Sequence, residues 1–120
     1  MDAVQFVAVV RQVVRNGAVA DVIHNLEAPP GRRPAAELVA DSTWYKTLDQ
    51  SQRKRLANVL NEAVDHALFG FFCVLDGVRA IESGEHRGRI ELRYMSESDE
   101  VTVLNQEPEM LHDIYNSYDS

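Results

Sequence analysis

The sequence is poor in the residues and motifs that build chemical sites. Its one cysteine, Cys73, excludes an internal disulfide, and apolar neighbours predict an unreactive core thiol. The four histidines are far apart, and no pair has the close spacing of a zinc motif. The hydrolase nucleophile elbow, the P-loop and the dinucleotide-binding glycine motif are all missing. We therefore expect no metal and no cofactor, and an enzyme is the less favoured interpretation.

Long hydrophobic runs are also missing. The longest apolar stretch, residues 67–75, is far shorter than the roughly 20 residues that a membrane-spanning helix needs. The start of the chain does not resemble a signal peptide, because no basic segment precedes the apolar residues and Arg11 and Arg15 interrupt them. We expect a soluble single domain, residues 1–120, in a reducing cytoplasm.

Positive charge is missing from the last quarter of the chain. Up to Arg93, twelve acidic residues balance twelve lysines and arginines, so the whole net charge of −7 arises after that point. The seven acidic residues there are Glu97, Asp99, Glu100, Glu107, Glu109, Asp113 and Asp119. A nucleic-acid-binding role is disfavoured, because it requires a basic surface that displaces counterions from phosphates.

The stretch 51–75 organises the rest of the chain. Its apolar residues have helical spacing, and beyond Ala67 they cover the whole circumference, which is typical of a helix end enclosed by other elements. Asp49 with Gln52 predicts a capping box at its start, and Gly77 predicts its end. The residues expected to share one buried core are Leu60, Ala67, Leu68 and Phe71.

Shorter helices are expected before this central one. Asp2 with Gln5 predicts a capped helix to about residue 15, and Asn16-Gly17 predicts a stop before a second helix over 18–27. The proline-rich segment 28–34 is either an ordered connector, which we favour, or a recognition arm with two exposed arginines. Asp41 is the expected N-cap of a helix over 42–48.

After the central helix the apolar period changes to two. Strands are expected over 90–94 and 101–103, preceded by a third over 78–82, because a two-stranded hairpin alone is marginal. Pro108 suits the first turn of a closing helix. The fold class is therefore α+β, with N-terminal helices, a long central helix, a small antiparallel β-meander and a C-terminal helix.

The run DHALFGFFCVLDGVRAIE, residues 65–82, with Trp44-Tyr45 upstream and LHDIYNSY downstream, resembles small uncharacterised bacterial single-domain proteins. Some small acidic bacterial proteins of this kind are immunity proteins that neutralise a toxin. The resemblance implies that the chain is a similar inhibitor, by size and charge and not by any matching functional residue.

The favoured function is a protein-binding module, in its concrete form an immunity-like or antitoxin-like inhibitor of a basic partner. An acidic surface steers such a partner, and tyrosines supply anchors. The expected partner-binding residues are Glu107, Glu109, Asp113, Tyr115 and Tyr118. The alternatives are a small enzyme or ligand-binding protein with a pocket between helices and sheet, and a self-associating homo-oligomer. Acidic residues near the core more often hold helix ends or pair with arginines than form a catalytic pair.

Overall fold

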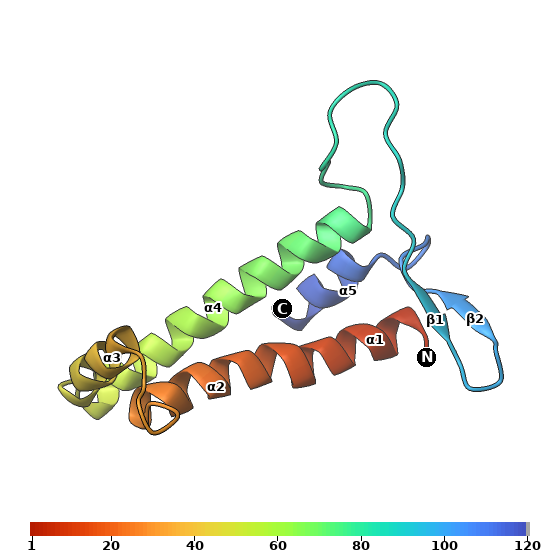
Figure 1. The fold of residues 1–120 in the computed structure, drawn as a ribbon. Coiled ribbons are helices and arrows are strands. Elements are labelled where there is room, and N and C mark those ends of the chain that lie inside the picture. The colour runs from red at the N-terminus through yellow and green to blue at the C-terminus, as the bar shows by residue number, and fades with distance from the viewer. Residues whose placement is uncertain (120) are drawn as a thin grey trace. The chain divides into compact units, whose positions relative to one another are not determined.

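The chain forms an α+β fold, described by a computed structural model for residues 1–119 (Figure 1). Its helical elements are α1 (Ala3–Val9), a π-helical segment (Val10–Arg15), α2 (Asn16–Glu27), α3 (Ala36–Lys46), α4 (Gln50–Leu75), α5 (Leu111–Asn116) and a 3-10 turn (Ser117–Asp119). The strands β1 (Arg93–Met95) and β2 (Val101–Val103) pair antiparallel. The fold class expected from the sequence is confirmed.

Two compact units divide the chain. Unit 1 is Met1–Val13 with His66–Ser120, and unit 2 is Val14–Asp65. Because α4 begins at Gln50 and ends at Leu75, the boundary between the units falls within this helix. The expected single domain over residues 1–120 stays a prediction.

The helix ends that depend on local signals are where the sequence predicts them. Asp2 accepts a hydrogen bond from the Gln5 N–H at 2.8 Å, and the Gln5 side chain accepts from the Asp2 N–H at 2.9 Å. The same reciprocal pair joins Asp49 and Gln52 at the start of α4. Gly77, with φ of 78°, follows the end of α4 in the left-handed conformation that glycine adopts without strain.

The expected stop at Asn16-Gly17 is wrong, because helical structure continues through it into α2. Glycine inside a helix costs only about 1 kcal/mol relative to alanine, so a local contact can outweigh it. Arg15 supplies such a contact, donating to both carboxylate oxygens of Asp65 at 3.0 and 3.1 Å. This two-bond ion pair holds the backbone in helical geometry just before the glycine.

In unit 2, α3 begins at Ala36, so the expected N-cap at Asp41 is wrong. The residues that follow Ala35 are strong helix formers, and Glu37 in the first turn interacts favourably with the helix dipole. Tyr45, near the end of α3, is buried. The Arg53 guanidinium carbon lies 4.7 Å from the centre of that ring, so a cation stacks on the main aromatic residue of this unit.

The buried side of α4 differs from the expected one. Phe72 is 2% exposed, whereas the neighbouring Phe71 is 58% exposed and Ala67 is exposed as well. Leu60 and Leu68 are half-buried, and Leu68 packs against the core of unit 1. The core expected from Leu60, Ala67, Leu68 and Phe71 is therefore wrong in Ala67 and Phe71. Adjacent helical residues point about 100° apart, and this end of α4 is apolar on every side. Periodicity therefore could not select the side that other elements cover.

The core of unit 1 forms where α1, α4 and α5 meet. The Phe72 ring lies 6.3 Å from the Phe6 ring in an edge-on arrangement and 5.5 Å from the Tyr115 ring, centre to centre. Helices α1 and α5 pack against each other (Figure 1). The buried members of the core are Ala3, Val7, Phe72, Leu111 and Tyr115.

The expected three-stranded meander is a two-stranded hairpin. Arg93 pairs with Val103 and Met95 with Val101, whereas no strand forms over 78–82. The strand expected over 90–94 is also displaced, and β1 begins at Arg93. The Ile90 carbonyl accepts a hydrogen bond from the Asn105 side chain, so its backbone is satisfied without a neighbouring strand.

The closing helix α5 begins at Leu111, later than the first-turn position expected for Pro108. The start is set by Asp76, which follows α4 in sequence. Its Oδ2 accepts a hydrogen bond from the His112 backbone N–H at 2.8 Å. One of the otherwise unsatisfied N–H groups at the start of α5 is thereby capped by a residue distant in sequence.

Candidate functional site

A shallow groove in unit 1 lies where α1 meets α5 and the segment before it. Its volume is about 440 Å³. The lining residues of this C-terminal groove are Val4, Pro108, Glu109, Met110, Asp113, Ile114, Ser117 and Tyr118. Val4 is exposed, and Met110 and Ile114 are half-buried, so apolar surface lies beside two carboxylates.

Three of the five residues expected to bind a partner line this groove: Glu109, Asp113 and Tyr118. Glu107 is exposed and immediately precedes the lining residue Pro108. Tyr115 is different, because it is 1% exposed and belongs to the core. Its ring is therefore unavailable as a surface anchor, whereas Tyr118 is 41% exposed.

The groove also has a cationic neighbour that the sequence did not reveal. The Arg11 guanidinium carbon lies 4.7 Å from the centre of the Tyr118 ring and 6.0 Å from that of Tyr115. A cation over the face of a ring is attracted by its π electrons, so Arg11 fixes the orientation of Tyr118. Arg11 Nη1 is buried and has no hydrogen-bond partner within the described part of the chain. No local pattern could pair residues from the two ends of the chain.

His112 contacts two carboxylates, that of Asp76 just after α4 and that of its neighbour Asp113 within α5. Its Nδ1 lies 2.6 Å from Asp76 Oδ2, and its Nε2 lies 3.3 Å from Asp113 Oδ1. The Asp76 side chain is fully buried. Both ring nitrogens already face carboxylate oxygens, so neither is directed at a substrate. The contacts position α5 and give no direct support to catalysis.

Asp65, Asp76 and Glu82 each have a hydrogen-bond partner within the chain. Asp65 binds Arg15, and Asp76 caps α5. Glu82 accepts from the Gly88 N–H at 3.3 Å within the same loop. The interpretation that such acids hold helix ends or pair with arginines fits these contacts.

A second hollow, missed in the sequence, lies within the 78–90 loop, which joins α4 to the strand region. Its volume is about 410 Å³. The lining residues are Val74, Asp76, Gly77, Arg79, Ala80, Ile81, Glu82, Arg87, Gly88, Arg89 and Ile90. The sequence indicated only a strand over 78–82 in this region, and no strand forms there.

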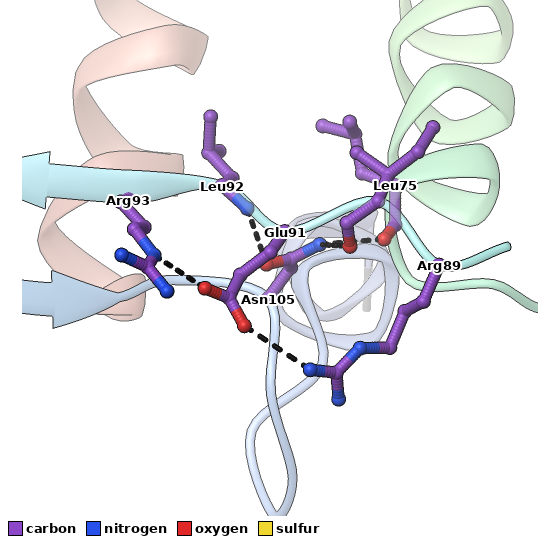
Figure 2. A network of polar contacts seen from close by, with 7 residues as sticks. Leu75, Arg89, Glu91, Leu92, Arg93 and Asn105 are labelled. Atoms are coloured by element: carbon purple, nitrogen blue, oxygen red, sulfur yellow. Dashed lines mark hydrogen bonds and ion pairs between the residues drawn. The ribbon is translucent and has the colours of Figure 1, made fainter.

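Asn105 closes the base of the 78–90 loop (Figure 2). Its side-chain nitrogen donates to the Leu75 carbonyl at 2.6 Å and to the Ile90 carbonyl at 2.9 Å. Its side-chain oxygen accepts from the Leu92 N–H at 2.8 Å. One amide therefore connects the end of α4 with the chain that returns from the loop. Figure 2 also shows Glu91 bridging Arg89 and Arg93 beside this contact.

Within residues 1–119, no cluster of three or more His, Cys, Asp or Glu side chains is arranged to hold a metal ion. The same residues contain no helix with both the length and the apolar character to cross a membrane. No protein-family model, curated protein or solved structure matches this chain, so its similarity to known proteins contributes nothing to a functional assignment.

Proposed function

We propose that the chain is a protein-binding module that docks a basic protein segment in the C-terminal groove. The observation that carries the proposal is the convergence of Glu109, Asp113 and Tyr118 on one hollow with apolar lining. Lysine and arginine side chains suit such a surface, because their aliphatic stems cover apolar atoms while their charged ends reach carboxylates.

The charge distribution favours the same partner. Glu109 and Asp113 line the groove, and no lysine or arginine follows Arg93 in the sequence, so a basic segment bound there relieves the repulsion between these carboxylates. Tyr118 offers an aromatic contact whose orientation Arg11 restricts, which lowers the entropy lost on binding. In its concrete form the module is an immunity-like inhibitor of a basic toxin in a bacterial cytoplasm.

Binding to the groove is tested by NMR titration of the full chain with a short amphipathic lysine–leucine peptide. We expect shifts at Val4, Met110, Ile114 and Tyr118, and weaker binding as salt is added, because exposed charges are screened. A glutamine–leucine peptide of equal length controls for apolar contact alone. Shifts spread over the whole acidic surface, or equal binding of both peptides, would contradict the proposal.

Charge reversal at the groove should slow association with a basic partner. The variant Glu107→Lys, Glu109→Lys, Asp113→Lys is expected to lower the association rate constant about tenfold or more at low salt, because steering is lost. The matched control reverses Asp21, Glu27 and Asp41, which are exposed in unit 2. Equal rates for the two variants in stopped-flow mixing with the lysine–leucine peptide would exclude the groove as the steering surface.

A further inference from the structure

The 78–90 loop has the construction of a ligand-binding loop. It contains no helix or strand, and loops of this length without regular structure inside compact units are often binding loops. Asn105 closes its base, and the N–H groups of Val78 and Arg79 both donate to the Cys73 carbonyl at the end of α4. The start and the end of the loop are therefore fixed, while the residues between them surround the hollow.

Part of the wall of this hollow is aliphatic. Val74, Ile81 and Ile90 line it, and Ile81 is 65% exposed. The volume of about 410 Å³ lies within the range of small-molecule sites. Exposed aliphatic side chains around a hollow favour a ligand whose own apolar part covers them.

Five charged side chains line the hollow, and three of them have partners. Asp76 contacts His112 and caps α5, and Glu82 accepts from the Gly88 N–H. Arg89 pairs with Glu91 at 3.1 Å. The side chains of Arg79 and Arg87 form no hydrogen bond or ion pair with the part of the chain that the structure describes. Their guanidinium N–H groups therefore remain available as hydrogen-bond donors, and an anion is the ligand that accepts most strongly from them.

Gly70 explains how Arg79 is positioned. A Cβ atom at Gly70 would lie 2.7 Å from Arg79 Nη1, so the guanidinium rests against α4 at the one residue that has no side chain. Glycine is among the poorest helix formers, and at this position it leaves room for the Arg79 guanidinium beside α4. Arg79 belongs to the loop, and its guanidinium is positioned by contact with α4 at Gly70.

We propose that the 78–90 loop binds a small amphipathic anion, a carboxylate or phosphate on an aliphatic body, through Arg79 and Arg87. The planar guanidinium forms paired hydrogen bonds with either group, and the aliphatic body lies on Ile81 and Ile90. This site uses none of the residues of the C-terminal groove, so it adds a ligand to the proposed protein-binding function and does not depend on it.

The proposal is tested by NMR titration of the full chain with octanoate and with octyl phosphate. Octanamide, which lacks the charge, and inorganic phosphate, which lacks the aliphatic chain, are the control ligands. We expect shifts in residues 78–90 with either amphipathic anion, and the tighter of the two identifies the head group. No shift in these residues with either anion, or equal affinity for octanamide, would overturn the proposal.

Two variants assign the binding to the arginines. Arg79→Gln with Arg87→Gln should weaken the affinity about tenfold or more, as expected for lost hydrogen bonds to a charged group. The matched control, Arg32→Gln with Arg33→Gln, removes the same charge from exposed positions in unit 2 and should bind normally. Gly70→Ala retains both charges but displaces Arg79, so it should also lose affinity. Unchanged affinity for the amphipathic anions in the double glutamine variant would refute the assignment. If that variant does not fold, unchanged affinity in Gly70→Ala would refute it instead.

Discussion

Phe72→Ala is expected to lower the free energy of unfolding by about 3–5 kcal/mol, the range for truncating a buried aromatic residue. Phe72 is 2% exposed and lies between the rings of Phe6 and Tyr115. Truncation removes buried apolar surface and two aromatic contacts, and it leaves a cavity where α1, α4 and α5 meet. Urea or guanidinium unfolding, followed by circular dichroism, measures the change.

The adjacent residue provides the control for this prediction. Phe71→Ala makes the same chemical change one position earlier on α4, where the side chain is mostly exposed. We expect it to change the free energy of unfolding by less than about 1 kcal/mol, as for a surface substitution. A larger loss from Phe71→Ala than from Phe72→Ala would show that the opposite side of α4 is buried.

Asn105→Ala is expected to destabilise the protein by about 2–4 kcal/mol, because three backbone groups lose their partners. These groups are the Leu75 carbonyl, the Ile90 carbonyl and the Leu92 N–H. Hydrogen exchange should also become faster at Leu92, whose N–H bonds to the substituted side chain. Chemical unfolding and exchange measured on the same variant separate a loss of global stability from local opening of the loop.

Two further substitutions test the role of the Asn105 amide. Asn105→Asp retains an acceptor for the Leu92 N–H but cannot donate to either carbonyl, so it should be destabilising as well. Asn58→Ala, at an exposed position of α4, is the matched control and should be close to neutral. A neutral Asn105→Ala would mean that the base of the 78–90 loop does not depend on this side chain.

The features that could be predicted from the sequence depend on neighbouring residues. The capping boxes at Asp2 and Asp49 require a partner three positions away, and the left-handed Gly77 requires only its own lack of a side chain. The fold class likewise follows from the change in apolar period after α4. Such signals lie within a single turn or element and are visible without tertiary structure.

The features that could not be predicted depend on contacts between distant residues. Asp76 sets the start of α5, and Arg15 with Asp65 carries the helix through Gly17. Asn105 satisfies the backbone at Ile90, where a strand was expected. In each case a side chain from another element supplies the hydrogen bond that a regular structure or a local cap would otherwise provide.

The candidate groove was predictable in charge but not in shape. The excess of acidic residues after Arg93 indicated a face for a basic partner, and Glu109, Asp113 and Tyr118 do line one hollow. The helical spacing of Tyr115 and Tyr118 could not tell which ring is buried, because Tyr115 is covered by α1 and α4 residues that are remote in sequence.

Capture from a bacterial lysate by three immobilised forms of the chain tests most directly whether the groove binds a protein. The forms are the wild type, the groove variant with Glu107, Glu109 and Asp113 changed to Lys, and the control variant with Asp21, Glu27 and Asp41 changed to Lys. We expect a basic protein that the wild type and the control retain, that the groove variant loses, and that added salt releases. Equal retention of that protein by all three forms, or its retention at high salt, would contradict binding through the C-terminal groove.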